Sequence, residues 1–182
     1  MTMDRPPGNT IDAIMRHPVF GTSPSGETRE MEVDTRGQTY TTAKIYTVKT
    51  TIPGIGTAAA YASGDAFGGK FFVPTPREGT IAKVVFYDLD DEGLSKDLVL
   101  FDTQFTATAD NGEFDVSDAD LLNCVGVIGI DTFYNFKSNQ LGVVSPAYEF
   151  YAPNGGLWCQ LVTRGADNIA ANNLPSIMVV IV

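Results

Sequence analysis

Short runs of β-branched and aromatic residues, separated by turn residues, dominate the sequence from Tyr40 to Val182. Such runs are typical of strands, and Gly, Pro, Asn and Asp between them are typical of turns. Because the runs do not alternate with helix-length segments, α/β folds with a parallel sheet are excluded. The pattern predicts an all-β protein, a jelly-roll or Greek-key β-sandwich of about eight strands. The predicted strands are residues 40–52, 69–73, 79–90, 97–105, 124–136, 147–152, 156–165 and 176–182.

One short helix is predicted within D-V-S-D-A-D-L-L-N-C, residues 115–124. Ser117 is the expected N-cap, and Asp118 and Asp120 in the first turn suit the helix dipole. The strand at 97–105 is expected to form a hairpin with the strand before it. The final run S-I-M-V-V-I-V would be an aggregation hazard on an exposed edge, so we expect it to be paired inside a sheet.

Residues 1–39 differ in texture from the rest, with four prolines and few consecutive apolar residues. We expect an extended N-terminal arm at 1–39, followed by a β-sandwich domain at 40–182. A helical turn or two is expected at 10–16 and a loop at 21–37. The arm is either a disordered tail or a segment that orders on a neighbouring subunit, and its apolar residues favour the second alternative. These residues are the predicted interface: Ile11, Ile14, Met15, Val19 and Phe20.

The chain is acidic, with a formal net charge of −10. Its basic residues are scattered, so binding to nucleic acid or to an anionic membrane is not expected. The sequence has no membrane-spanning apolar run and no visible secretion signal. The two cysteines, Cys124 and Cys159, lie in apolar strand-like runs. Two buried free thiols in a protein that folds in cytoplasm are expected, with a disulfide left open.

The stretch G-D-A-F-G-G-K, Gly64 to Lys70, has the spacing of a phosphate-binding loop. Phe71 stands where such a loop needs a hydroxyl for Mg²⁺, and the prolines at 74 and 76 follow in place of a helix. We therefore interpret the stretch as a turn entering a strand. Gly64, Gly68 and Gly69 would supply positive φ angles or a close backbone approach.

The acidic segments give only weak indications of chemistry. D-L-D-D-E-G at 88–93 resembles the start of a calcium loop, but Val99 occupies the position that requires a glutamate, so a solvated turn is expected. The carboxylates at 110–120 would suit glycoside hydrolysis only if two of them faced each other across a cleft. His17, the sole histidine, lies in the arm. We therefore predict no catalytic, metal-binding or cofactor-binding residue, and no enzymatic activity.

Six aromatic residues could form a sugar-binding platform, although alternating aromatics in strands more often pack in a core or between subunits. They are Tyr134, Phe136, Tyr148, Phe150, Tyr151 and Trp158. Trp158 is most simply a core residue.

The pattern D-N-x-x-F-x-x-S-D-A-D-L-L at 110–122 and the pattern L-V-T-R-G at 161–165 resemble the head decoration, or cement, proteins of tailed bacteriophages. The resemblance covers about residues 58–182. It implies a jelly-roll-like sandwich that folds in the host cytoplasm and acts on the outer surface of the virion capsid. The implied partners are the major capsid protein and further copies of the chain, as a dimer or trimer. Such a protein bridges neighbouring capsomers and stabilises the head against packaged DNA. The alternative is a carbohydrate-binding module, or a tail or fibre component for host attachment.

Overall fold

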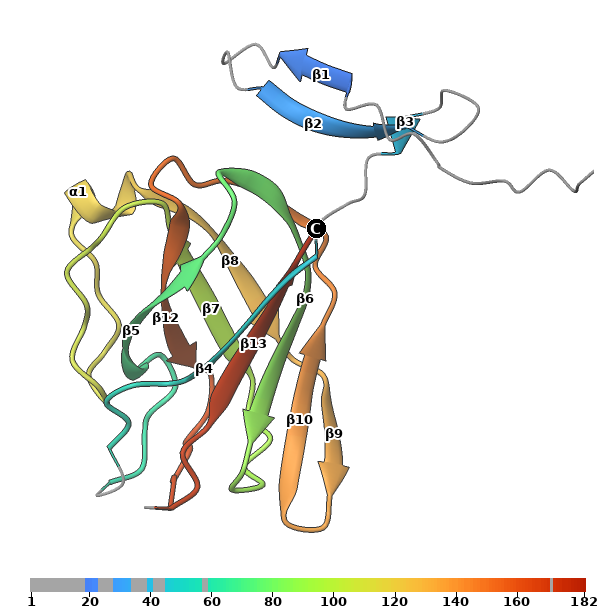
Figure 1. Cartoon of the computed structure of the whole chain (residues 1–182). Helices are drawn as coiled ribbons and strands as arrows, with labels where there is room; N and C mark the ends of the chain where they lie inside the picture. Colours follow the sequence, from blue (N-terminus) through green and yellow to red (C-terminus); the bar gives the residue numbers. More distant parts are fainter. Residues whose placement is uncertain (1–18, 23–27, 34–38, 41–44, 57–58, 171) are drawn as a thin grey trace, which may run out of the picture. The chain divides into compact units, whose positions relative to one another are not determined.

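A computed structural model describes residues 19–22, 28–33, 39–40, 45–56, 59–170 and 172–182, the first three ranges as backbone strands only (Figure 1). The chain divides into two compact units, Met1–Ala43 and Lys44–Val182.

The N-terminal unit contains a three-stranded antiparallel sheet in the order β1-β2-β3. Its strands are β1 (Val19–Thr22), β2 (Thr28–Val33) and β3 (Thr39–Tyr40). Residue 19 of β1 lies opposite residue 31 of β2. The prediction of a loop across 21–37 is therefore wrong at β2. The sequence T-R-E-M-E-V alternates polar and apolar residues, a strand pattern that the surrounding Gly, Pro and Ser obscured. The helical turn expected at 10–16 lies outside the described residues.

The second unit is a sandwich of two antiparallel sheets. The larger sheet has the order β4-β13-β6-β10-β9, with β11 also paired to β6, and lies in the nearer layer in Figure 1. The smaller sheet has the order β5-β12-β7-β8. The larger sheet comprises β4 (Tyr46–Thr51), β6 (Glu78–Asp88), β9 (Phe133–Phe136), β10 (Asn139–Val144), β11 (Tyr148–Tyr151) and β13 (Ser176–Ile181). The smaller comprises β5 (Ala66–Pro74), β7 (Lys96–Phe101), β8 (Cys124–Ile130) and β12 (Gly156–Thr163).

Eight of these strands have the strand order of a jelly roll, in which successive strands alternate between the two sheets in pairs of Greek keys. The predicted fold class is confirmed. β9 and β11 are two short additions to the larger sheet. The prediction for the C-terminus is also confirmed, because β13 lies between β4 and β6 and pairs with both.

The space between the sheets is filled by one hydrophobic cluster drawn from nearly every strand. Aromatic contacts run through it: Phe67 lies 6.0 Å from Phe86, and Phe86 lies 6.5 Å from Phe133, both pairs edge to face. Edge-to-face pairs place the positive rim of one ring against the negative face of the next. Cys159 is buried in this cluster and Cys124 is half-buried; both are free thiols, as expected.

Two details of strand pairing differ from the sequence analysis. The strand predicted at 97–105 does not form a hairpin with β6, because β7 belongs to the other sheet, between β12 and β8. Both edges of β6 are already occupied by β13, β10 and β11. The strand predicted at 124–136 is two strands, because the chain turns at residues 131–132 and passes from β8 in one sheet to β9 in the other.

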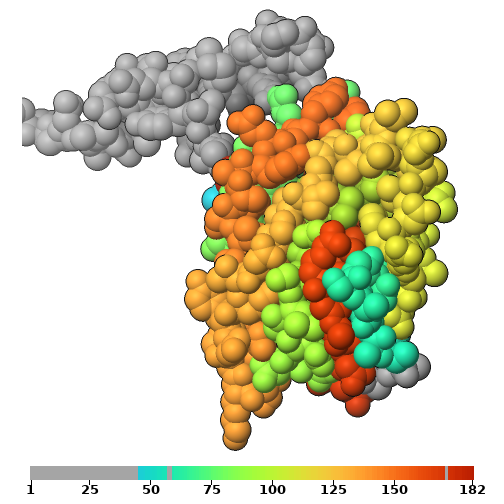
Figure 2. All heavy atoms as spheres, turned by 180° about the vertical axis from the view of Figure 1, so that it is seen from behind, coloured from blue at the N-terminus to red at the C-terminus, as the bar shows by residue number. Residues whose placement is uncertain are grey.

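The segment 102–123 covers part of the outer face of the smaller sheet. Phe105, together with Val99, Phe101 and Val162 of the sheet, forms a second buried cluster there. Figure 2 views this layer, with the segment as yellow spheres along one side. The segment includes the helix α1 (Asp118–Leu121), which was predicted correctly: the Ser117 hydroxyl caps it by accepting from the Asp120 N–H at 3.1 Å.

Candidate functional site

The glycine-dense stretch Gly64–Lys70 begins as a turn and enters β5, as the sequence predicted, but the strand starts at Ala66, so Gly68 and Gly69 lie within it. Gly64 and Gly68 have φ angles of 102° and 76°. A Cβ at Gly68 would lie 2.5 Å from Ile52 Cγ2 and 2.8 Å from the Pro53 carbonyl oxygen. Lys70 lies inside β5, and its ammonium group donates to the Phe105 carbonyl. A phosphate loop requires a helix at this lysine, so the stretch is not a nucleotide site.

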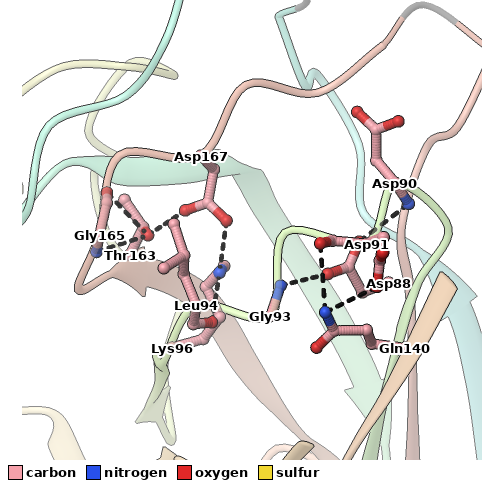
Figure 3. A network of polar contacts seen from close by, with 10 residues as sticks. All are labelled: Asp88, Asp90, Asp91, Gly93, Leu94, Lys96, Gln140, Thr163, Gly165 and Asp167. Carbon is pink, nitrogen blue, oxygen red and sulfur yellow. Dashed lines mark hydrogen bonds and ion pairs between the residues drawn. The ribbon is translucent and has the colours of Figure 1, made fainter. Parts of the chain in front are cut away.

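The acidic turn after β6 is held together by its own carboxylates (Figure 3). Asp88 accepts from the N–H groups of Asp90 at 3.0 Å and Gly93 at 2.8 Å. Asp90 accepts in turn from the N–H of Ala170 and from the Asn173 amide, at 2.6 and 2.7 Å. Across the described ranges, no group of three or more His, Cys, Asp or Glu side chains is arranged to hold a metal. These carboxylates therefore fix loop geometry.

Asp110, in the second acidic segment, also holds loops together. Its carboxylate accepts from the N–H groups of Gly56 and Gly68 and from the Tyr61 hydroxyl, each at 2.7 Å. Burial and the hydrogen bond to Asp110 raise the pKa of Tyr61 well above its usual value. Asp120 accepts from the Thr106 N–H at 3.2 Å. Both carboxylates organise backbone, which gives the hydrolase alternative no support.

A buried ion pair joins the start of β7 to the loop after β12 (Figure 3). Lys96 and Asp167 are each only 1% exposed, and their Nζ and Oδ1 atoms are 2.7 Å apart. Lys96 also donates to the Leu94 carbonyl at 2.6 Å, and the Thr163 hydroxyl donates to Asp167. Burial lowers the pKa of Lys96, and Asp167 opposes that shift. With its partners satisfied, the pair is a structural tie whose loss would leave a buried charge unpaired.

The six candidate aromatics do not form one platform. Phe150 is buried, and Trp158 is half-buried with its ring 5.1 Å from Phe72, in the second cluster. The Tyr148 hydroxyl donates across the sandwich to the Val125 carbonyl. The three exposed rings are Tyr134, Phe136 and Tyr151. Tyr134 and Tyr151 lie near opposite ends of the sheet. Tyr134 pairs with Leu141, which in turn lies opposite Tyr87 of β6. Tyr151 lies opposite Glu78, nine positions before Tyr87 on the same strand. At about 3.3 Å per residue, about 30 Å separates Tyr151 from the rings on β9.

A row of apolar side chains lies on the outer face of the larger sheet. Side chains alternate across a strand, so residues between the core-facing positions of β6 and β13 point away from the core. Val85 is only 5% exposed yet belongs to neither buried cluster. It lies opposite Met178 on one side and Val143 on the other. We define the outer patch as these aligned outward residues: Met178, Val85, Val143, Tyr87, Leu141 and Tyr134.

The two sheets thus differ in how their outer faces are covered. The smaller sheet is covered in part by the chain's own segment 102–123. Over the larger sheet, no other described segment of Lys44–Val182 forms a buried cluster with the outer patch. The sequence analysis missed this face, although a signal was present. The runs V-V-F-Y in β6 and I-M-V-V-I in β13 are continuously apolar, a pattern typical of strands buried on both sides.

A shallow hollow of about 300 Å³ lies between the start of β4 and the end of β5. It is lined by Tyr46, Thr47, Val48, Pro74, Thr75 and Pro76. The lining contains no carboxylate, imidazole, amine or thiol, and its polar side chains are the hydroxyls of Tyr46, Thr47 and Thr75.

The predicted interface residues of the arm are not placed by the structure. Ile11, Ile14 and Met15 lie outside the described residues. Val19 and Phe20 fall in β1, of which only the backbone is described. Their role in an interface stays a prediction.

Comparisons with known proteins leave the family open. No protein-family model and no curated protein matches the sequence. A chain in the structure of the infectious bursal disease virus Gx strain is similar at 10% identity with a TM-score of 0.36. The match covers 91% of this chain and 37% of the viral chain, so the protein spans little more than a third of that chain's length. A similarity this weak supports neither a family nor a function. Among the described residues, no helix has the length and apolar character to cross a membrane.

Proposed function

We propose that this protein is a non-enzymatic structural component of a virion, which decorates the outer surface of a phage capsid and cements neighbouring capsomers. The observation that carries the proposal is the outer patch, an apolar area on the outer face of the larger sheet, in which Tyr134 is exposed, Val85 is buried and the other four side chains are half-buried. Contiguous apolar area on the surface of a soluble protein marks an interaction site. The resemblance of residues 110–122 and 161–165 to decoration proteins points to the same role.

The hydrogen bonds made by the charged side chains support a binding role and not a catalytic one. Asp88, Asp90, Asp110 and Asp167 accept hydrogen bonds from the protein itself, and Lys96 donates to Asp167 and to the Leu94 carbonyl. Groups engaged in this way hold loops in place and are not free to transfer protons to a substrate. The surface therefore offers a partner contact area.

Contact area is sufficient for a cementing role because many copies act together. Burying apolar surface contributes about 25 cal/mol per Å², so one subunit on the shell gains a modest affinity. When subunits also bind each other, each further contact with the shell becomes intramolecular, which multiplies the overall binding strength of the layer. The proposed partners are the major capsid protein and other copies of this chain, as a dimer or trimer. The net charge of −10 favours solubility and opposes non-specific association of separate subunits.

The test is co-sedimentation of the full chain with heads of the phage that encodes it, stripped of decoration. We expect saturable binding at a fixed number of copies per head, and heads that lose their DNA at a higher temperature. Leu141→Asp, which places a charge in the outer patch, should reduce occupancy. Gln104→Asp is the matched control on the opposite layer, because this exposed residue lies outside the patch.

The arm is tested in the same assay. A chain without residues 1–39 should bind fewer copies or none if the arm anchors on a neighbour. Full occupancy without the arm would contradict that part of the proposal, and a full chain that ignores heads would contradict the cement role itself.

The alternative is a glycan-binding module or a tail or fibre component for host attachment. It is favoured by Tyr134 and Phe136 alone, two exposed rings on the edge strand β9 that could stack on a sugar. A chain that binds host glycans, loses this binding on Tyr134→Ala, and does not sediment with heads would establish it.

A further inference from the structure

The outer patch has a basic border along two strands. Lys49 of β4 lies directly opposite Met178, and its ammonium group is 3.9 Å from the Tyr87 ring centre. Lys83 is two positions from Val85 on the same face of β6, and both lysines are exposed. The acidic residues of this sheet face, Glu78 and Glu149, lie at the start of β6, where it pairs with β11; Glu149 is opposite Thr80, three positions before Lys83.

A surface of the opposite character lies around α1. Leu121 and Leu122 are 55% and 88% exposed, the latter among the most exposed apolar side chains described. They are bordered by carboxylates, with Asp115 and Asp118 exposed and Asp120 half-buried. We name this apolar tip with its acidic border the α1 knob, comprising residues 115–122.

The knob is matched to the outer patch in polarity and in charge. One is a protruding pair of leucines ringed by aspartates, and the other is a flat apolar face bordered by lysines. Opposite charges at the border of an interface guide its register, while the apolar centre supplies most of the affinity.

The fold prevents a molecule from making this contact with itself. The knob belongs to the segment over the smaller sheet, and the outer patch is on the far face of the larger sheet, so the whole sandwich lies between them. A second copy is therefore the occupant that carries the matching surface and can reach the patch.

We propose that the α1 knob of one copy docks on the outer patch of another, through Leu121 and Leu122 at the centre and Asp118 against Lys83 at the border. The two surfaces differ, so the contact is heterologous and each copy has one of each. Such contacts close into rings or continue as open arrays, depending on the rotation between copies. The proposal extends the proposed function, because it names the subunit–subunit contact of the cement layer.

The test is self-association of the full chain, measured by sedimentation equilibrium and by cross-linking. Leu122→Asp should raise the dissociation constant about tenfold or more, because it places a charge at the apolar centre of the contact. Lys83→Glu and Asp118→Lys should each raise the dissociation constant about fivefold. The double variant should return it to the wild-type value, because the charge pair is re-formed in reverse. A carbodiimide should link Asp118 to Lys83 between labelled and unlabelled copies.

Val127→Asp is the matched control, since Val127 is 51% exposed on the free edge strand β8, outside both surfaces. It should leave association unchanged; dissociation by Val127→Asp in place of Leu122→Asp would overturn the proposal in favour of edge pairing. A chain that stays monomeric at its solubility limit would also overturn it, as would a double charge reversal that fails to restore binding.

These outcomes are separable from the fate of the proposed function. A monomeric chain that still saturates heads refutes the knob contact and leaves the cement role. A chain that associates through the knob but ignores heads does the reverse.

Discussion

Glycine conformation provides the sharpest prediction for single residues, because two glycines share a φ angle and differ in surroundings. Gly68 and Gly155 have φ angles of 76° and 77°. A Cβ at Gly68 would collide with Ile52 and with the Pro53 carbonyl, whereas one at Gly155 would meet nothing within 4 Å. Gly155→Ala should cost about 1 kcal/mol from backbone strain alone, and Gly68→Ala about 2–4 kcal/mol because a clash with backbone is added.

Urea unfolding of both variants measures this difference. Equal costs would mean that the chain around Ile52 moves aside without penalty, which would contradict the close packing described for the turn.

Glu92 gives a pH-dependent prediction. Burial, followed by the charges of Asp167, Asp90 and Asp88, raises its pKa in the folded state. A raised carboxyl pKa means that the folded state binds the proton more tightly. The contribution of Glu92 to folding stability is therefore fully present below the pKa it has in the unfolded state. It is lost as the pH rises through its pKa in the folded state.

Glu92→Gln should therefore raise the unfolding temperature at neutral pH, where the wild-type carboxylate is charged beside other carboxylates. The gain should shrink to nothing at about pH 3, where the wild-type side chain is protonated in both states. Thermal melts across this pH range provide the measurement, and a gain that stays constant with pH would show that charge is not the cause.

Some of these residues could be predicted from sequence and others could not. The positive φ angles of Gly64 and Gly68 were predicted, although Gly68 lies inside β5, because local backbone geometry is encoded locally. The burial of Lys96 was missed, since its partner Asp167 is 71 positions away and a lysine at a strand start looks like a solvated one. Long-range pairing has no signature in a single sequence.

At the scale of elements, the strands were recognised but their partners were less predictable. β6 and β7 follow each other and were expected to form a hairpin, yet they lie in different sheets. Periodicity identifies a strand and its core face, but says nothing about which edges are already occupied. β10 was missed because N-Q-L-G-V-V begins with polar residues and carries a central glycine, both depleted in strands.

The contact between Tyr148 and β8 predicts how the two sheets are tied. The Tyr148 hydroxyl donates to the Val125 carbonyl, and a Cβ at Gly126 would collide with that hydroxyl. Tyr148→Phe should cost about 1–2 kcal/mol, because a partly buried carbonyl loses its donor. Tyr134→Phe is the matched control, since Tyr134 is 57% exposed, and should change stability by less than about 0.5 kcal/mol. Equal effects in chemical denaturation would contradict a tie between the sheets.

At the scale of the whole molecule, the fold class followed from the rhythm of strands and turns, while the candidate contact surface did not. The outer patch is assembled from four strands, β13, β6, β10 and β9, of which only β9 and β10 are neighbours in sequence. Its signature in the sequence is the continuous apolar runs of β6 and β13, a pattern that also indicates strands buried on both faces. Sequence placed the predicted interface in the arm instead, at residues whose side chains the structure does not describe.

The division into two units predicts that the sandwich is stable without the arm. The described residues of both buried clusters lie at positions 48–181, and the chain divides after Ala43. Removal of residues 1–39 takes none of these described side chains away. The shortened chain should unfold within about 0.5 kcal/mol of the full chain, because sites that share no partners contribute independently.

Unfolding in urea, followed by the fluorescence of Trp158, measures this comparison, since that ring packs within the second cluster. If stability holds while head occupancy falls, the arm is an anchor attached to a self-sufficient block, and its energy appears only when a neighbour is present. If stability falls as well, residues 1–39 contribute to the folded sandwich itself. In that case a loss of head binding could no longer be assigned to a missing anchor, and the arm's interface would have to be tested by single substitutions at Val19 and Phe20 in the full chain.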